Sequence, residues 1–459
     1  MSKKIMCLML VFVLLLPSVL AGCGNNQQEG KTVIEDSQSK TEEVAANTQA
    51  KPEEEKVTLE VWNCDSAPMY TDLFDKMIKN FTDKNPNIQV NYTGIPWDSS
   101  KEKFDTAIAT NTTPDTAYIL HSWVSSFAAA DGIIPLDSYY GNWADKSKFD
   151  PNMLGLQGLK IDGKTYNAPV EVVPVTVWYR PDWYAEAGVS IPQTFDEFFT
   201  NIQKMTDQSK KRFGFTIRGG TGGSQQLEAF LMAYSGDARY FDESGKCLIN
   251  SPKIVEGFEK FVALYKKYTP ESDITNGYKE MSAVFDGGTA ATLFHNVTSL
   301  PMHRDTLGEG KYASFMLPKA DNGKRIICFT GVAATAGYSI FKSSKKPDVA
   351  WKFIEHLLST ESDSMWAKEL GILPANKDVM KEDWVQQTPS LLVAQSAMED
   401  KDTELAMAPI DLPDYAGIHK NLLEPGLQEV LIGKKTAEAY LTEWAEAFEK
   451  AKQEYDKKG

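Results

Sequence analysis

Apolar and polar residues alternate over short runs of this chain, and longer runs with helical spacing separate them. The first short run, Val57–Trp62, alternates apolar and polar positions, which is typical of a strand with one buried face. The next apolar residues recur at the spacing of one helical face: Leu73, Phe74, Met77, Ile78 and Phe81. An Asn-Pro-Asn run at 85–87 ends this helix, and Ile88–Tyr92 alternates again. The segment therefore predicts a strand, a helix and a strand.

The same alternation of predicted strands and helices continues through the rest of the chain. Four further runs predict strands: Thr116–Leu120, Val170–Tyr179, Phe213–Ile217 and Thr292–Phe294. Helices are predicted between them, and two have clear starts: a capping box at Thr194–Glu197, and Pro252 in a first turn after Ser251. The fold class is therefore α/β, with two units joined near 170–175 and a mainly parallel sheet covered by helices.

The first residues predict an export signal. Two lysines precede an apolar run, Ile5–Leu16, that is too short to cross a membrane permanently. The signal ends in Leu20-Ala21-Gly22-Cys23, which resembles the bacterial lipobox, in which the cysteine is lipidated. An ordinary signal peptide with a chance cysteine is the alternative. We expect residues 1–22 to be removed and Cys23 to anchor the protein on the outer face of the bacterial cytoplasmic membrane.

The tract that follows Cys23, up to residue 56, predicts a disordered tether. It is polar and has no aromatic residue, so it cannot bury enough apolar area to offset the entropy of ordering. No later stretch reaches 18 consecutive apolar residues. We therefore expect the lipid anchor to be the only contact with the membrane.

Composition narrows the possible functions. With 459 residues, 42% of them hydrophobic, the chain is long enough for two lobes with large cores. A net charge of −15 argues against nonspecific binding of nucleic acid, which needs a basic surface. The five histidines and five cysteines show no metal-ligand spacing, so no metal or cofactor is expected. Cys64, Cys247 and Cys328 are expected to be free and buried, although the sequence leaves one disulfide open.

Nine short motifs occur in an order that is found in one protein family. They are Asn85–Ile88, Pro96–Asp98, Pro114-Asp115, Gly132–Asp137, Asp162–Pro169, Phe285–Ala291, Gly337–Ile340, Pro347–Ile354 and Gly371–Ala375. Together they resemble the extracellular solute-binding proteins of family 1, the carbohydrate-binding components of ABC importers. The resemblance covers nearly the whole globular part of the chain.

This resemblance implies two α/β lobes that are joined by hinge strands and close around a ligand in the cleft between them. It places the lobes at 57–171 plus 334–390 and at 174–328 plus 394–459, with crossing segments near 171–174, 328–333 and 390–394. It also implies a monomer, and partners that are a sugar or oligosaccharide and the subunits of an ABC permease.

The chemistry of a sugar indicates which types of residue would bind it. Its hydroxyls need polar partners in fixed geometry, and its apolar C–H face stacks on Trp or Tyr. Open α/β sheets bind ligands beyond the carboxyl ends of their strands. Polar and aromatic residues on the loops that follow strands are therefore the candidates.

The first unit offers five such candidates. Asp65 follows the first strand and is either a ligand acceptor or a simple turn residue. Trp97 lies in an Ile-Pro-Trp-Asp turn and contacts either the ligand or other parts of the lobe. His121, Ser122 and Trp123 follow the third predicted strand, where the family's loop lines the cleft. By this resemblance Trp123 is a stacking platform and His121 a sugar contact, with a capping or loop role as the alternative for the histidine.

Further candidates lie near the expected crossing and in a glycine-rich turn. Glu171 is either a ligand residue or a buried hinge carboxylate held by backbone N–H groups. The turn after Arg218 offers Gly222, Gly223 and Gln225 as residues that line the cleft, and a merely flexible turn is the alternative. The turn lacks the spacing of both nucleotide-binding glycine motifs, so nucleotide binding is not expected.

The last candidates rest on the resemblance alone. His295 and Asn296 follow a predicted strand and correspond to the family's cleft loop. Gly331 and Tyr415 are also candidates, with packing as the alternative. The sequence thus predicts a binding protein that captures a sugar by hinge closure and delivers it to a permease.

Two other functions stay open at this point. A surface-anchored hydrolase acting on glycans needs two carboxylates at a defined separation. The chain has 63 acidic residues, so the sequence alone does not show which two would form such a pair. Gly-x-Ser-x-Gly and His-Glu-x-x-His are absent. The same fold with a non-sugar ligand, such as a polyamine, a peptide or a metal chelate, is the other alternative.

Overall fold

The computed structural model describes residues 56–149, 160–330, 336–412 and 414–457. The expected signal peptide, Cys23, the tether up to residue 55 and the candidate Gly331 therefore lie outside the described residues.

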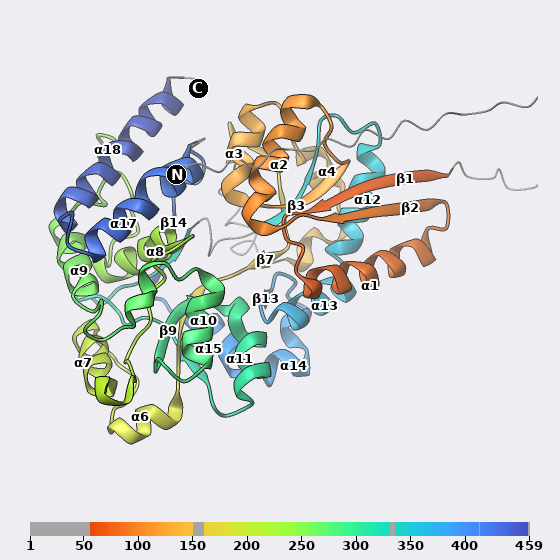
Figure 1. Ribbon diagram of the computed structural model, residues 1–459. Coiled ribbons are helices and arrows are strands. Elements are labelled where there is room, and N and C mark those ends of the chain that lie inside the picture. The colour runs from red at the N-terminus through yellow and green to blue at the C-terminus, as the bar shows by residue number, and fades with distance from the viewer. Residues whose placement is uncertain (1–55, 150–159, 331–335, 413, 458–459) are drawn as a thin grey trace, which may run out of the picture. The chain divides into compact units, whose positions relative to one another are not determined.

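The first sheet has five strands in the order β2-β1-β3-β12-β6 (Figure 1). They are β1 (Val57–Asn63), β2 (Ile88–Gly94), β3 (Thr116–Leu120), β6 (Ala168–Pro169) and β12 (Ala336–Ile340). β1 is parallel to β2 and β3, whereas β12 is antiparallel to β3 and to β6. The predicted parallel arrangement is thus confirmed for β1, β2 and β3, and a segment from far along the chain completes the sheet.

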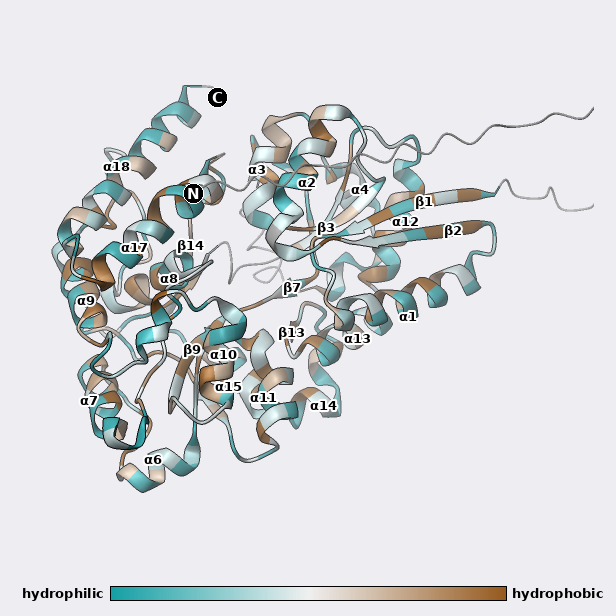
Figure 2. Cartoon of the chain, in the orientation of Figure 1, coloured by the Kyte–Doolittle hydropathy of each residue, from teal (hydrophilic) through white to brown (hydrophobic). Residues whose placement is uncertain are grey.

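The helices of this part follow the predicted faces. They are α1 (Pro68–Lys84), α2 (Trp97–Thr110), α3 (His121–Ala129), α4 (Asp137–Asn142), α12 (Pro347–Leu357), α13 (Thr360–Leu370), α14 (Asp383–Gln386) and α15 (Pro389–Glu399). The α1 helix buries Leu73, Phe74, Met77 and Phe81 and ends at Asn85, as the spacing predicts. Figure 2 shows hydrophobic stretches on β1 and β2 beside a mixed surface on α1.

The second sheet differs from the prediction. Its strands β8 (Val175–Tyr179), β9 (Thr292–Asn296) and β10 (Ala313–Phe315) have the order β10-β8-β9 and are antiparallel. The prediction of a mainly parallel sheet is therefore wrong here. Alternation along a strand shows that one face is buried, but it carries no information on the direction of the neighbouring strand.

The strand predicted at Phe213–Ile217 is also wrong. Only two isolated parallel bridges form there, at Phe213 to Ala290 and Thr216 to Leu293. The backbone N–H of Ile217 donates to the carboxylate of Asp273 at 2.6 Å, and that of Phe215 donates to the carbonyl of Tyr268. Loop groups therefore take part of the backbone hydrogen bonds of this segment, while the N–H groups of Phe213 and Thr216 donate to the carbonyls of Thr289 and Thr292.

Helices cover the second sheet. They are α6 (Pro181–Ala187), α7 (Phe195–Met205), α8 (Gly223–Ser235), α9 (Pro252–Val262), α10 (Tyr278–Asp286), α11 (Leu300–Leu307), α16 (Tyr415–Ile418), α17 (Glu424–Leu431) and α18 (Ala437–Asp456). The capping box before α7 forms: Thr194 accepts the N–H of Glu197, and Glu197 accepts the N–H of Gln193. The second bond reaches one residue further back than the motif predicts.

Three short strand pairs complete the structure. They are β4 (Lys160–Ile161) with β5 (Lys164–Thr165), β7 (Glu171–Val172) with β13 (Leu373–Pro374), and β11 (Arg325–Phe329) with β14 (Thr403–Met407). The first two pairs are antiparallel and the third is parallel. None of the helices in the described ranges is both long enough and apolar enough to span a bilayer.

The buried apolar residues form two large cores. The first core comes mainly from residues 59–173 and 336–397, and the second mainly from 175–294 and 406–451. The strand β11 contributes to both, because Ile327 and Phe329 lie in the first core and Ile326 and Cys328 in the second. Successive side chains of a strand point to opposite faces, so β11 lies between the cores.

The cysteine prediction is confirmed where the structure describes it. Cys64, Cys247 and Cys328 are free and buried. Burial raises the pKa of all three thiols, so they are inert apolar groups of the two cores at neutral pH.

Gly214 provides a test of the unusual packing of the 213–217 segment. A Cβ atom at Gly214 would lie 1.9 Å from the carbonyl oxygen of Ile202. We predict that Gly214→Ala lowers the free energy of unfolding by about 1–3 kcal/mol or more, because the backbones must separate. Urea denaturation measures this loss.

Gly141→Ala is the matched control. A Cβ atom there meets nothing within 4 Å, and the residue lies inside α4, so its stability should be unchanged or slightly higher. A Gly214→Ala protein that unfolds at the same urea concentration as the natural protein would contradict the packing described here.

Candidate functional site

Asp65 follows the end of β1 and shapes the turn into α1. Its N–H donates to Oδ1 of Asn63 at 2.9 Å, and its own Oδ1 accepts the N–H of Ala67 at 2.7 Å. These are the bonds of a turn residue, which is one of the two roles that the sequence predicts for Asp65. The residue as a whole is half-buried beside the strand end.

The charge of Asp65 reaches residues of both sheets. The pKa of Tyr70, on α1, is raised by burial and by the charges of Glu171 and Asp65. The pKa of Tyr278, at the start of α10, is raised by burial and also by Asp65, against the lowering effect of Arg218. The charges of Asp65 and Arg218 therefore both act on Tyr278, in opposite directions.

Glu171 is buried at the start of the connection between the two cores. Its carboxylate accepts the hydroxyl of Tyr118 at 2.6 Å and the indole N–H of Trp366 at 2.8 Å. The donors are thus side chains and not the backbone N–H groups of the expected alternative. Burial raises the pKa of Glu171 to about 7, against the two hydrogen bonds.

His121, Ser122 and Trp123 form the first turn of α3, and all three are buried. The Nε2 atom of His121 is 2.6 Å from Oδ1 of Asn167, and burial lowers the pKa of the histidine to about 4. His121 is therefore neutral at pH 7. The family loop that the sequence predicted here is the start of a helix in the structure.

The two candidate tryptophans of this part differ in exposure. Trp123 is 7% exposed and packs on Phe104 and Phe127, with ring centroids 6.1 and 6.2 Å apart. These contacts make Trp123 part of the first core. Trp97 is 39% exposed at the start of α2.

The glycine-rich turn forms the start of α8. Gly222 is its N-cap with φ 78°, a conformation that favours glycine, and its N–H donates to Oε1 of Glu424 at 2.5 Å. A Cβ atom at Gly223 would lie 2.2 Å from the carbonyl oxygen of Arg218. Both glycines are thus required by local geometry, and Gln225 is buried in the first turn of α8.

Arg218 precedes this turn, and the sequence did not single it out as a binding residue. The side chain is 9% exposed, and its Nε donates to the carbonyl of Thr221 at 2.6 Å. Burial lowers the pKa of Arg218 to about 10, so it stays charged at pH 7. An arginine that directly follows an apolar run and precedes glycines is the signal that could have found it.

His295 and Asn296 end β9. The His295 ring stacks on the ring of Tyr278, with centroids 4.8 Å apart and planes 14° apart. Burial and the Arg218 charge lower the pKa of His295 well below its usual value, so the ring is neutral. Its Nδ1 atom is buried without a hydrogen-bond partner among the described residues. Asn296 caps the turn that follows, because its Oδ1 accepts the N–H of Thr298.

Tyr278 is the second residue that the sequence analysis missed. It is half-buried and begins α10, far along the chain from the strand whose end it covers. Only the tertiary structure places it beside His295. Tyr415, by contrast, is fully buried in the second core and donates to Glu228 at 2.6 Å.

The structure therefore brings some predicted residues together and separates others. Asp65, His295 and Asn296 lie at strand ends, and Tyr278 stacks on His295, whereas Trp123 and Tyr415 lie inside the cores. In the described part of the chain, no group of three or more His, Cys, Asp or Glu side chains is placed to hold a metal ion.

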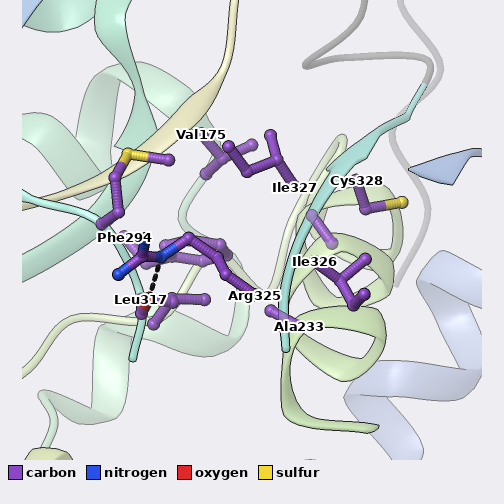
Figure 3. Close-up of a pocket in the computed structure, with 10 residues that line it drawn as sticks. Val175, Ala233, Phe294, Leu317, Arg325, Ile326, Ile327 and Cys328 are labelled. Carbon is purple, nitrogen blue, oxygen red and sulfur yellow. Dashed lines mark hydrogen bonds between the residues drawn. The ribbon is translucent and has the colours of Figure 1, made fainter. Parts of the chain in front are cut away.

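A cavity in the second part lies apart from this region (Figure 3). It has a volume of about 20 Å³, and its lining includes Val175, Phe294, Ile327 and Cys328. Arg325 crosses it and donates to the carbonyl of Leu317 at 3.3 Å. A cavity of this size holds about one water molecule, so it is too small for a sugar.

Comparison with known proteins identifies the family. Residues 67–363 match the model of the bacterial extracellular solute-binding proteins. The chain belongs to this family and is therefore a binding protein and not an enzyme. A curated relative is the diacetylchitobiose binding protein DasA of Streptomyces coelicolor, 24% identical over 407 residues, which cover 83% of this chain and 87% of that protein.

Solved structures show the same fold. An ABC transporter solute-binding protein of Thermotoga lettingae with bound alpha-D-tagatose has a TM-score of 0.74 at 22% identity, covering 86% of this chain and 100% of that one. An ABC substrate-binding protein of Listeria monocytogenes in complex with cycloalternan has a TM-score of 0.73 at 22% identity, covering 87% and 100%. The predicted two-lobed α/β fold of periplasmic binding proteins is confirmed.

The buried Glu171 gives a prediction on pH. Its pKa in the folded protein lies above the ordinary value of 4.5, so the folded state holds the proton more tightly than the unfolded state. This contribution is complete below pH 4.5 and is lost as the pH rises towards 7. Glu171→Gln removes this pH-dependent contribution. The difference in the free energy of unfolding between the natural protein and Glu171→Gln should therefore shrink by roughly 1–3 kcal/mol between pH 5 and 8.

Urea denaturation at several pH values measures the gap, and the exposed Glu259→Gln is the control. A gap that stays constant or widens with pH would show that Glu171 is ionised in the folded protein at pH 5.

Proposed function

We propose that the protein is the substrate-binding lipoprotein of an ABC importer and that it captures a sugar or oligosaccharide in a cleft between two lobes. One observation carries the proposal. In a member of a solute-binding family, Asp65 after β1 and Tyr278 at the start of α10 are both half-buried, and the charge of Asp65 acts on Tyr278. The relatives named above bind a chitobiose derivative, tagatose and cycloalternan, which are all carbohydrates or carbohydrate derivatives.

The proposed lobes follow the two cores. We retain 57–171 plus 334–390 as lobe 1 and 174–328 plus 394–459 as lobe 2, with one refinement. Ala394 and Ala397 belong to the first core and Ala406 to the second, which favours a third crossing within β14. The first crossing is short, because Val173 lies in the first core and Val175 in the second.

The proposed ligand residues come from both lobes. Asp65 accepts sugar hydroxyls from lobe 1. The exposed face of Tyr278 stacks on the apolar face of the sugar, while His295 and Asn296 lie behind it at the end of β9. The other predicted contacts, including Trp97, Glu171 and the Gly222–Gln225 turn, remain proposals for the walls and the hinge of the cleft.

Closure must be favoured by contacts that only the closed state makes. Two polar contacts already join the two parts: Ser125 donates to the carbonyl of Asp411, and Lys420 is 3.1 Å from Glu102. The Lys420–Glu102 pair is exposed, and such pairs contribute little. The ligand itself therefore supplies most of the free energy that favours the closed state, and delivery to a permease follows.

A sugar screen tests the proposed function. Thermal shift against mono- and oligosaccharides, followed by calorimetry, should give a saturable ligand without turnover. A ligand present at 100 times its Kd stabilises the folded state by about 2.7 kcal/mol, which raises the Tm visibly. A hit only among polyamines, peptides or metal chelates would select the non-sugar alternative.

Tyr278 provides the matched variants. We predict that Tyr278→Ala weakens binding of the sugar at least tenfold, about 1.4 kcal/mol, because the stacking surface is lost. Tyr278→Phe keeps the ring and should lose less, and Tyr455→Ala on α18 should bind like the natural protein. Equal affinities for all three would remove Tyr278 from the site.

The lipid anchor is tested separately. Cys23→Ala should abolish incorporation of labelled fatty acid and move the protein from the membrane fraction to the medium or periplasm, because Cys23 is the proposed attachment point. Cys7→Ala, within the apolar run of the signal, is the control and should remain lipidated. Fatty acid that remains on the Cys23→Ala protein would contradict the lipobox.

A further inference from the structure

Arg218 differs from every other arginine of the chain. The other five all form ion pairs with a carboxylate: Arg180, Arg212, Arg239, Arg304 and Arg325. Arg218 forms none with the described residues, although it is buried. The charges of Glu424 and Glu280 act on Arg218, but among the described residues no carboxylate is in direct contact with the buried guanidinium, which is a costly arrangement.

The immediate surroundings leave the end of the guanidinium available. Among the described residues, the one hydrogen-bond partner of the guanidinium is the carbonyl of Thr221, which accepts from Nε. The terminal nitrogens lie over Gly222, where a Cβ atom would be 2.4 Å from Nη2, so the absence of a side chain at Gly222 makes room for the guanidinium. Glu424, at the start of α17, accepts the N–H of Gly222, and its charge also acts on Arg218 without forming an ion pair with it.

Two more features point towards a ligand at this place. The His295 ring is 4% exposed, and its Nδ1 lacks a protein partner among the described residues. The ring of Tyr278 covers that histidine. A planar aromatic surface, an unsatisfied ring nitrogen and an unpaired guanidinium thus come together at one end of the second sheet.

We propose that the site takes a sugar acid, a hexuronate alone or within an oligosaccharide, whose carboxylate pairs with Arg218. This inference rests on the proposed function and names its class of substrate. A planar guanidinium matches a carboxylate through two parallel hydrogen bonds, which a hydroxyl cannot reproduce. The sugar face lies on Tyr278, which covers His295, and the hydroxyls reach Asp65 of the other lobe.

Matched ligands test the charge directly. Calorimetry with the purified protein compares galacturonate and glucuronate, as monomers and short oligomers, with their methyl esters and with the neutral galactose and glucose counterparts. The acid should bind at least tenfold more tightly than its own methyl ester, because the ester keeps the shape of the sugar and removes only the charge.

Variants at Arg218 assign that preference. Arg218→Gln should bind acid and ester equally, and Arg218→Lys should keep part of the preference because it retains the charge without the planar fork. The exposed Arg239→Gln is the control and should behave like the natural protein. Thermal unfolding reports whether each variant is folded. If Arg218→Gln does not fold, the preference of Arg218→Lys for acid over ester decides the assignment.

The outcomes separate the two proposals. Neutral sugars that bind as tightly as the acids would overturn the inference and leave the sugar-binding function standing. A preference for acids that survives in folded Arg218→Gln would also overturn the assignment to Arg218. If no sugar of either kind binds, both the inference and the proposed function fail.

Discussion

The chain must leave one hydrophobic core and enter the other within a few residues, and the rest of the structure depends on this constraint. Val173 and Val175 belong to different cores, and Ile326 to Phe329 on β11 alternate between them. A strand can serve two cores in this way because its side chains alternate between two faces. The polar residues that end β1 and β9 are consequently directed to the boundary between the cores.

Buried polar groups gather at this boundary, and local packing does not require them all. Glu171 is satisfied by Tyr118 and Trp366, so it stabilises the start of the first crossing. Among the described residues, the terminal nitrogens of Arg218 and the Nδ1 atom of His295 have no hydrogen-bond partner. Proteins depart from consistent packing mainly at functional sites, which is why the proposed site is argued from Arg218 and His295.

Periodicity along the chain was enough to predict the elements that bury one face. The β1-α1-β2 unit follows the spacing of its apolar residues almost residue by residue, and the cap at Thr194 forms. The prediction failed where tertiary contacts replace the local pattern. Phe213–Ile217 has the composition of a strand, but Asp273 and Tyr268 take its hydrogen bonds.

The site was harder to predict for the same reason. Asp65 and His295 follow strands, so the sequence could nominate them. Trp123 looked like a stacking platform, yet its neighbours Phe104 and Phe127 enclose it in the first core. Tyr278 begins a helix and joins His295 only through the fold, and no local pattern shows that Arg218 forms no ion pair with the described residues. Contacts between distant segments decide all of these points.

A crystal structure of the protein with the tightest ligand from the sugar screen is the most direct test of the central claim. The account predicts a sugar held between the two lobes, with contacts from Asp65 on one side and from Tyr278 and Arg218 on the other. A ligand that contacts only one lobe, or that lies away from the ends of β1 and β9, would contradict it.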